Sequence, residues 1–215
     1  MLVAMAPGPS PAQRPLGAVL AGGAGRRIGG DKAAVSLLGV PLVHWTVAAV
    51  REVVEEVVVV AKPDTVLPPL AGLADVLVEP AEPRHPVCGV LHALRQAGGR
   101  PVLAVAVDLP LLDGATLRAL LGAPRAGLHA VVATAGGRRQ PLCALYLPGA
   151  LAELEGFAPD ARLMEVVGSL AVGEVEVDPA ALHNVNAPED LWSASGLLSG
   201  RPGPRALPPR ASASG

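Results

Sequence analysis

The stretch LGAVLAGGAGRRIGGDK, residues 16–32, joins a short apolar run to a loop that contains five glycines. The apolar run has the length and composition of a buried β-strand. The glycines expose backbone N–H groups that can surround phosphate oxygens, and the flanking cations can neutralise them. The stretch therefore predicts a strand followed by an anion-binding loop.

Two common phosphate-binding loops do not fit this stretch. The dinucleotide-binding pattern G-x-G-x-x-G needs a third glycine at the position of Ile28. The nucleoside triphosphatase loop ends in G-K-[ST], whereas this loop ends in Asp31-Lys32-Ala33 and offers no hydroxyl for magnesium. The loop thus keeps the physical parts of a phosphate site without either arrangement.

Strand-like and helix-like segments alternate along the chain after this loop. The runs 57–61 and 102–108 are nearly continuous in aliphatic residues, which is typical of parallel strands covered on both faces. The alternation predicts an α/β fold with a single doubly wound, mostly parallel sheet flanked by helices. The expected strands are 16–21, 57–61, 75–79, 102–108, 130–135 and 174–178, and the expected helices are 41–55, 87–97, 114–121 and 187–194.

The composition at the two ends separates a central domain from its tails. Residues 1–15 and 196–215 are rich in Pro, Gly, Ser and Ala, so we expect disordered tails around one domain at 16–195. The N-terminal segment lacks the basic region of a signal peptide, and no apolar stretch reaches the length of a membrane span. We therefore expect a cytoplasmic protein that does not enter a membrane.

Charge and aromatic content exclude a nucleic-acid partner. The net charge is −2 and aromatic residues make up 2% of the chain, which leaves neither a basic field nor a stacking surface. Cys88 and Cys143 have no metal-ligand spacing and are interpreted as small buried residues in a reducing compartment. Only Lys32 and Lys62 are lysines among 17 basic residues. Either Lys32 marks a site that requires a compact ammonium, or the two lysines remain by chance.

Asp108 is the best metal ligand that the residues alone suggest. It ends the apolar run VLAVAV, so its carboxylate lies at the mouth of a buried strand, where a charge needs a cation or hydrogen-bond donors. Magnesium prefers one or two carboxylates together with phosphate oxygens. The alternative is a helix cap near residue 114, which Asp113 is better placed to provide.

Four motifs in order resemble one family. LAGGAGRRIGGDK (20–32) resembles the loop L-A-G-G-x-x-x-R-M-G-x-D-K of nucleotidyltransferases, and VDLPLL (107–112) resembles their D-x-P turn. RRQPLCALY (138–146) is similar to Q-P-x-x-A-L-Y, and HNVNAPEDL (183–191) to N-x-N-T-P-E-D-L. Together they resemble the molybdenum cofactor guanylyltransferase family over residues 16–192.

The resemblance implies a reaction and its participants. A member of this family transfers GMP from GTP to the terminal phosphate of molybdopterin, releases pyrophosphate, and uses Mg²⁺ or Mn²⁺. The fold that it implies is the Rossmann-like nucleotidyltransferase fold. The expected partners are GTP and molybdopterin, with molybdenum insertion proteins or molybdoenzyme chaperones as further candidates. The expected assembly state is a monomer or a weak oligomer.

The resemblance also assigns roles to individual residues, with Glu79 the nearest candidate for an acidic nucleotide-binding position. Arg138 to Gln140 are expected on a hairpin or loop that projects over the sheet and faces the acceptor. The catalytic candidates are Arg27, Lys32 and Asp108; the nucleotide-binding candidates are Leu20, Ala21, Gly22, Gly23, Gly25, Lys32, Glu79 and Asp108; the acceptor-binding candidates are Arg138, Arg139, Gln140, Asn184 and Asn186; and the metal ligands are Asp108 and Asn186.

Two departures from the family pattern concern the nucleobase. Lys62 stands near the position of a family asparagine after the second strand, and His85 begins the segment that corresponds to a G-P-L-A-G turn. Base identity therefore stays open, with a molybdopterin cytidylyltransferase or another NTP or sugar-phosphate nucleotidyltransferase as alternatives. A nucleotide-binding or chaperone-binding homologue without turnover is the non-enzyme alternative. Asn186 also has an alternative role, as a turn residue before a helix.

Overall fold

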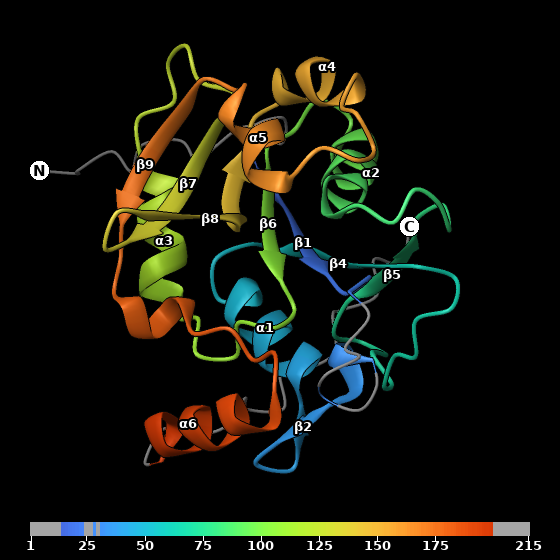
Figure 1. Ribbon diagram of the computed structural model, residues 1–215, viewed down its shortest axis with the longest axis vertical. Helices are drawn as coiled ribbons and strands as arrows, with labels where there is room; N and C mark the ends of the chain where they lie inside the picture. The colour runs from blue at the N-terminus through green and yellow to red at the C-terminus, as the bar shows by residue number, and fades with distance from the viewer. Residues whose placement is uncertain (1–13, 24–27, 29–30, 200–215) are drawn as a thin grey trace, which may run out of the picture.

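A single seven-stranded sheet organises the chain, in the strand order β5-β4-β1-β6-β8-β7-β9 (Figure 1). The computed structural model describes residues 14–23, 28 and 31–199. Only β8 runs against its neighbours, so the expectation of a mostly parallel sheet is confirmed. The strands are β1 (Leu16–Leu20), β4 (Glu56–Ala61), β5 (Asp75–Val78), β6 (Val102–Ala106), β7 (Ala130–Ala135), β8 (Arg138–Tyr146) and β9 (Val172–Glu176).

Helices cover both faces of this sheet, which confirms the doubly wound arrangement. One apolar cluster joins α1 and α3 to strand residues such as Val57 and Leu103. A second joins α2, α4 and α5 to residues on the opposite face, among them Leu16 and Val102. The helices are α1 (Leu42–Arg51), α2 (Pro86–Ala97), α3 (Gly114–Gly122), α4 (Ala150–Glu155), α5 (Leu163–Gly168) and α6 (Pro188–Leu198).

The direction of the crossovers reverses between β1 and β6. From β1 the chain passes through α1 to β4 and on to β5, and α2 then leads back to β6 on the other side of β1. Ligands of open α/β sheets bind in the crevice that such a reversal leaves beyond the carboxyl ends of the strands. The loops after β1 and β6 are therefore the ones that the topology places around a crevice.

A smaller unit packs against α1 below the main sheet (Figure 1). It consists of the 3-10 helix η2 (Lys32–Ala34), the two-stranded sheet of β2 (Ser36–Leu37) and β3 (Val40–Pro41), and helix α6. Leu37, Trp45 and Leu198 belong to its apolar cluster. This packing fixes the end of the glycine-rich loop, where Lys32 begins η2. A second 3-10 helix, η3 (Pro179–Leu182), precedes α6.

The hairpin expected near residue 138 is present, and its second strand is longer than the sequence indicated. Gly136 and Gly137 form the two-residue turn with φ of 55° and 73°, the positive values that such a turn requires. Residues 138–146 then form β8, between β6 and β7, instead of a loop over the sheet. The short helices α4 and α5 were also not expected from the sequence.

The boundaries of the expected tails differ at one end. Helix α6 continues to Leu198, so the expected tail start at residue 196 is wrong: Gly196–Leu198 are helical. Residues 1–13 and 200–215 lie outside the described residues.

Cys143 is buried, and burial raises the pKa of its thiol to about 12, as expected of an unreactive core residue. Within the described part of the chain, no helix is long and apolar enough to cross a membrane.

Candidate active site

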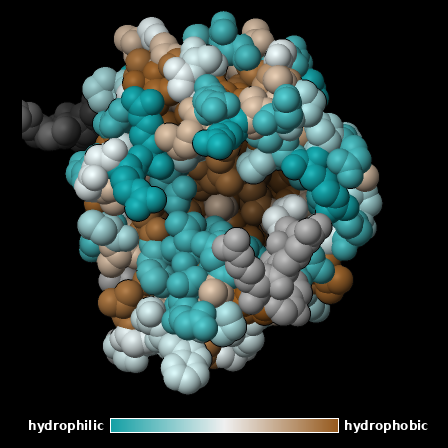
Figure 2. Space-filling model, viewed as in Figure 1, coloured by the Kyte–Doolittle hydropathy of each residue, from teal (hydrophilic) through white to brown (hydrophobic). Residues whose placement is uncertain are grey.

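A cavity of about 490 Å³ opens beyond the carboxyl ends of the strands next to the crossover reversal. Figure 2 shows this face hollowed near its middle, with hydrophobic residues inside the hollow and hydrophilic residues around it. The apolar part of the wall comes from strand ends such as Val60 and Ala106. Six residues expected at the site line the cavity: Leu20, Gly22, Gly23, Lys32, Glu79 and Asp108.

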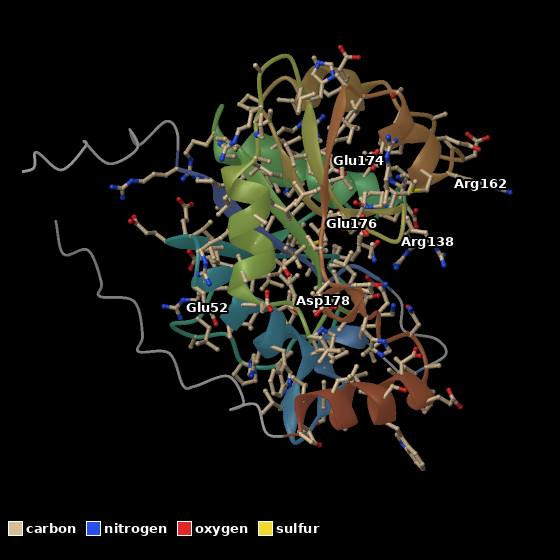
Figure 3. The ribbon with its side chains drawn as sticks, turned by 90° about the vertical axis from the view of Figure 1, so that its left-hand side faces the viewer. Glu52, Arg138, Arg162, Glu174, Glu176 and Asp178 are labelled. Carbon is tan, nitrogen blue, oxygen red and sulfur yellow. The ribbon has the colours of Figure 1, made fainter. Side chains whose placement is uncertain are left out.

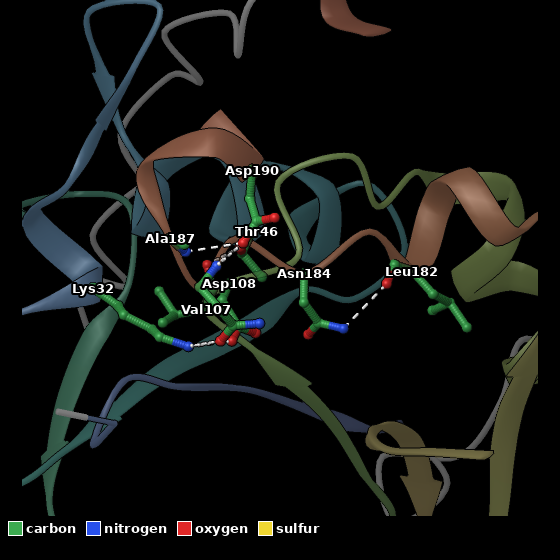
Figure 4. Close-up of polar contacts among 9 residues, drawn as sticks. Lys32, Thr46, Val107, Asp108, Leu182, Asn184, Ala187 and Asp190 are labelled. Carbon is green, nitrogen blue, oxygen red and sulfur yellow. Dashed lines mark hydrogen bonds and ion pairs between the residues drawn. The ribbon is translucent and has the colours of Figure 1, made fainter. Parts of the chain in front are cut away.

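Lys32, Asp108 and Asn186 meet at one side of this cavity, although Lys32 and Asn186 are 154 positions apart. The Lys32 Nζ donates to Asp108 Oδ2 at 2.7 Å (Figure 4). It also donates to Asn186 Oδ1 at 2.5 Å. The side chains of Lys32 and Asp108 are only 16% and 14% exposed, so solvent screens their attraction incompletely. The structure thus joins the expected cation to both expected metal ligands.

The backbone at Asp108 is held from two directions. Thr46 of α1 donates its Oγ1 to the Val107 carbonyl at 3.1 Å, and the amide of Val185 donates to the Asp108 carbonyl at 2.9 Å. Thr46 is fully buried, so the first contact is shielded from water. The helix-cap alternative for Asp108 is not realised, because Asp113 caps α3 by accepting from the Thr116 amide at 2.8 Å.

One oxygen of Asp108 has no partner. Its Oδ1 is buried and lacks a hydrogen bond among the described residues, while Oδ2 accepts a hydrogen bond from Lys32 Nζ. A buried carboxylate oxygen is costly when it is left unpaired. The oxygen is therefore positioned for a cation or donor that arrives with a ligand. No group of three or more His, Cys, Asp or Glu suited to a metal occurs in the described residues.

Asn186 is oriented by the start of α6. Asp190 Oδ2 accepts from the amides of Asn186 and Ala187 at 2.8 and 2.9 Å (Figure 4). These bonds, that of Asn186 first, hold the pKa of Asp190 below its ordinary value. Asn184 instead donates its amide to the Leu182 carbonyl at 3.2 Å, which shapes the turn before the helix. Asn186 is consequently both a turn residue and a neighbour of Lys32.

Lys62 and Glu79 form a second charged pair in the cavity wall. Lys62 is 4% and Glu79 is 5% exposed, and Lys62 Nζ lies 3.5 Å from Glu79 Oε2. Burial raises the pKa of Glu79, and the charge of Lys62 partly opposes that rise. The sequence assigned Lys62 no role. Two features of the sequence could have marked Lys62 as a site residue: it directly follows a buried strand, and it is one of only two lysines.

The β8 hairpin forms another part of the site's surroundings. The β6 ladder ends where Val105 faces Cys143, so the earlier residues of β8 extend beyond β6 on the cavity side. Pro141 has no amide to donate, and the ladder with β7 is interrupted there by an irregularity. Leu142, within this irregularity, lines the cavity. An apolar residue of β8 thus lines the cavity at the place where the ladder with β7 is irregular.

The two arginines of this hairpin differ in their surroundings. Arg139 donates Nε and Nη2 to Glu174 Oε1 at 2.8 and 2.5 Å, so its guanidinium already holds a carboxylate. Arg138 is exposed, and Figure 3 shows it projecting from the same side of the molecule as Arg162. Gln140 is half-buried and faces Ala133 of β7. Arg138 is therefore the more accessible cation of the hairpin.

The described residues include only part of the glycine-rich loop. Gly25 and Arg27 lie outside the described residues. Ala21 is described, and its amide donates to the Val60 carbonyl at 2.8 Å, which continues the ladder between β1 and β4. That amide is thus unavailable to a phosphate, and the amides that remain for a ligand begin at Gly22.

His85 belongs to the cavity lining and was missed as a site residue. Its Nδ1 accepts from the Val87 amide at 3.2 Å, which caps α2 and makes Nε2 the protonated nitrogen. Nε2 lies 3.0 Å from the Ala161 carbonyl, and the ring packs on Phe157 with centroids 4.8 Å apart. His85 therefore ties the wall of the cavity to the segment between α4 and α5.

Known proteins share both the sequence and the fold. A sequence profile described as the MobA-like NTP transferase domain matches residues 17–175. A molybdenum cofactor guanylyltransferase of Cereibacter sphaeroides is 36% identical over 86% of this chain and 97% of its own length. The protein of that name from Pseudomonas putida is 33% identical over 80% of this chain and 93% of its own.

Solved structures agree on the fold. Molybdopterin-guanine dinucleotide biosynthesis protein A of Archaeoglobus fulgidus superposes with a TM-score of 0.69 at 24% identity, covering 86% of this chain and 99% of its own. A 2-C-methyl-D-erythritol 4-phosphate cytidylyltransferase of Thermus thermophilus reaches 0.62 at 22% identity, over 87% and 99%. Proteins named for different nucleobases therefore share this fold, whereas the two sequence relatives above are both named molybdenum cofactor guanylyltransferases. The chain belongs to the MobA-like NTP transferase family and is a nucleotidyltransferase.

Proposed function

We propose that the chain transfers GMP from GTP to the terminal phosphate of molybdopterin and releases pyrophosphate. The observation that carries this proposal is the meeting of Lys32, Asp108 and Asn186 beside a cavity lined by the glycine-rich loop. Relatives with high coverage are named molybdenum cofactor guanylyltransferases, which supports the same base and acceptor.

The reaction needs positioning and charge neutralisation. An oxygen of the acceptor phosphate forms a bond to the α-phosphorus of GTP, while the bond from that phosphorus to the bridging oxygen of the β-phosphate breaks. Negative charge gathers on the departing pyrophosphate, and a fixed ammonium such as Lys32 stabilises it. Binding both substrates in one cavity also removes the entropic cost of bringing them together.

A divalent metal fits the donor set at this side of the cavity. The unpartnered Asp108 Oδ1 and the amide oxygen of Asn186 are the kinds of ligand that Mg²⁺ or Mn²⁺ accepts, together with phosphate oxygens. When bound, such an ion neutralises phosphate charge. Lys32 holds the Asp108 carboxylate and the Asn186 amide oxygen close together through its two hydrogen bonds.

We assign the nucleotide and the acceptor to different sides of the cavity. We assign Leu20, Gly22, Gly23 and Glu79 to the nucleotide, because all four line the cavity. Ala21 contributes through its carbonyl and packing only, since its amide is engaged. Gly25 and Arg27 keep their proposed contacts with the phosphates on the basis of the loop motif.

On the acceptor side, Arg138 is the proposed phosphate ligand, since an exposed guanidinium can bind a phosphate bidentately. Gln140 and Asn184 are assigned to the same side, and Arg139 acts there through its ion pair with Glu174. A cytoplasmic location, a monomeric or weakly oligomeric state, and contacts with molybdenum insertion or chaperone proteins stay predictions.

Pyrophosphate release tests the proposed function. The purified chain with Mg²⁺ and molybdopterin should release pyrophosphate from GTP faster than from CTP, ATP or UTP. Asp108→Asn keeps the size of the side chain and should slow release about 10²–10³-fold. Arg95→Gln is the matched control, because it removes an exposed ion pair between Arg95 of α2 and Glu155 of α4. Equal rates with CTP, or an active Asp108→Asn, would refute the proposal.

A further inference from the structure

The Lys62–Glu79 pair is the most deeply buried ion pair that the described residues form in the cavity wall. Glu79 follows β5 and Lys62 follows β4, so two adjacent parallel strands deliver opposite charges to the same place. Removing two charges from water is costly unless each one is well matched. The neighbouring wall consists of apolar strand ends, which do not stabilise charges. The presence of a buried ion pair there therefore suggests a role in ligand binding.

Lys62 is fully engaged within the protein. Its Nζ donates to the carbonyls of Pro80 at 2.6 Å and Pro83 at 3.1 Å, and lies 3.5 Å from Glu79 Oε2. The two carbonyls take two of the three N–H donors of the ammonium group, and the ion pair with Glu79 is its remaining contact. With 4% of its surface exposed, Lys62 offers a ligand almost no surface of its own. Its effect on a ligand must therefore pass through Glu79.

The carboxylate of Glu79 faces space that two glycines leave open. A Cβ at Gly22 would lie 2.8 Å from Glu79 Oε1, and a Cβ at Gly89 would lie 3.8 Å from Oε2. Both glycines and Glu79 line the cavity. Oε2 is buried and has no hydrogen-bond donor among the described residues. The carboxylate thus retains unused acceptor capacity beside the cavity.

The charge of Glu79 determines which end of a nucleotide it can meet. A carboxylate repels phosphates, so the triphosphate belongs near Lys32 and the uncharged end belongs near Glu79. An ionised carboxylate only accepts hydrogen bonds. Guanine presents two neighbouring N–H groups, at N1 and at its 2-amino group, whereas cytosine and adenine place a ring lone pair beside their amino group.

We propose that Glu79 selects guanine by accepting from its N–H groups, and that Lys62 is the positioning residue that keeps this carboxylate charged and directed at the base. The proposal rests on the proposed function, because it names how the same site recognises its nucleotide. It gives Lys62 a role that differs from direct contact with the ligand.

Nucleotide selectivity separates this role from a merely structural one. The ratio of dissociation constants for ITP and GTP reports the 2-amino contact, because inosine lacks only that group. We expect the folded wild-type chain to bind GTP about tenfold more tightly than ITP, since a hydrogen bond to a charged acceptor is among the stronger ones. Lys62→Met should bring the ratio close to one through weaker GTP binding.

Three further measurements make the test decisive. Glu79→Gln should also abolish the preference for GTP over ITP, because an amide replaces one acceptor oxygen with a donor. Arg95→Gln removes an exposed cation that does not line the cavity, and should keep the wild-type ratio. If Lys62→Met does not fold, Lys62→Gln, which keeps an N–H donor toward the proline carbonyls, takes its place and should lose the preference as well.

The results also distinguish the base from the ribose. Wild-type protein should bind 2′-deoxy-GTP as tightly as GTP; a selective loss for the deoxynucleotide, with ITP unaffected, would assign Glu79 to the ribose and overturn the proposal. A Lys62→Met chain that keeps the wild-type ratio overturns it too. In either case pyrophosphate release from GTP would still support the proposed function, whereas absent GTP binding and turnover would remove both.

Discussion

The Lys32 ammonium lies 2.7 Å from the Asp108 carboxylate and thereby connects the end of the glycine-rich loop to the end of β6. The two residues are 76 positions apart and are brought together because β1 and β6 are adjacent parallel strands. The contact is partly shielded from solvent, and Asp108 still has one oxygen without a partner. If the proposed function holds, we expect the pair to separate into a cation that binds phosphate and a carboxylate that binds a metal ion.

Replacing Lys32 with methionine tests this arrangement. The change removes the ammonium but keeps much of the apolar stem, so we expect pyrophosphate release from GTP to fall about 10²-fold. Mn²⁺ should bind at least as tightly as before, because Asp108 and Asn186 no longer share their oxygens with the ammonium. Turnover and metal titration followed by electron paramagnetic resonance measure the two effects. Loss of Mn²⁺ binding in this variant would contradict the separation of roles.

The strands that position this site could be predicted from the sequence because of their composition. The expected run 57–61 became β4 at Glu56–Ala61, and 130–135 became β7 without a shift of either end. Both strands are nearly all aliphatic and are buried by the layers on each face, which is the situation that periodicity identifies best. Strand β8 was recognised only as a hairpin, since its charged start and Pro141 hide the strand pattern.

A second prediction concerns the acid dependence of the Asn186 turn. Asp190 accepts from the amides of Asn186 and Ala187, and these bonds lower its pKa from 3.8. Because this pKa is lower in the folded chain than in the unfolded chain, the Asp190 carboxylate stabilises the fold fully above pH 3.8. That stabilisation is lost as the pH falls through the pKa of Asp190 in the folded chain. Asp190→Asn keeps an acceptor oxygen but removes its charge, so it should cost up to about 1 kcal/mol at pH 6, and less at pH 3.

Urea unfolding at the two pH values checks this difference. Asp178→Asn is the matched control, because Asp178 caps η3 through the Ala180 amide and does not contact the Lys32 cluster. Both variants should lose stability, but only Asp190→Asn should slow pyrophosphate release. Equal turnover in the two variants would show that the Asn186 turn does not position the reacting groups.

A third prediction compares two glycines in the fold. A Cβ at Gly17 would lie 2.6 Å from Val50 Cγ1 and 2.8 Å from Val54 Cγ2, so β1 and α1 touch through this glycine. Gly17→Ala should lower the free energy of unfolding by about 1–3 kcal/mol through overpacking. Gly196 within α6 has no atom within 4 Å of its Cβ position, and Gly196→Ala should raise stability by about 0.5–1 kcal/mol. Thermal unfolding of both variants measures the opposite signs, and destabilisation by Gly196→Ala would count against the α6 geometry.

The contacts of the site were harder to predict than its residues. Asp108 and Lys32 stood out by chemistry, as a charge after an apolar strand and a rare lysine. The ion pair of Lys62 with Glu79 depends on how the loops after β4 and β5 fold back, which no local pattern encodes. The same holds for Arg139, whose partner Glu174 is 35 positions away on an edge strand. Such pairings follow from tertiary packing and appear only in the folded chain.

A fourth prediction concerns His85 and the segment that it holds. His85→Asn keeps a side chain that can cap α2 but loses the contact with the Ala161 carbonyl and the packing on Phe157. We expect faster hydrogen exchange in residues 157–162, with little change in α2. His85→Ala should speed exchange in both segments. Unchanged exchange in residues 157–162 of the Asn variant would show that the segment is held by other contacts.

The two hairpin arginines provide the last prediction, because they combine similar chemistry with different surroundings. Arg138 is exposed at the start of β8, whereas Arg139 is held by Glu174 through two hydrogen bonds. If Arg138 binds the acceptor phosphate, Arg138→Ala should raise the KM for molybdopterin about tenfold and leave the KM for GTP unchanged, as expected for the loss of one charged hydrogen bond. Arg139→Ala should instead change stability slightly, since an exposed ion pair contributes at most about 1 kcal/mol. Steady-state kinetics with each substrate varied in turn measures both KM values. A larger molybdopterin effect in Arg139→Ala would mean that the Glu174 pair opens on substrate binding, and that the acceptor phosphate binds to the guanidinium which β9 holds in the free protein.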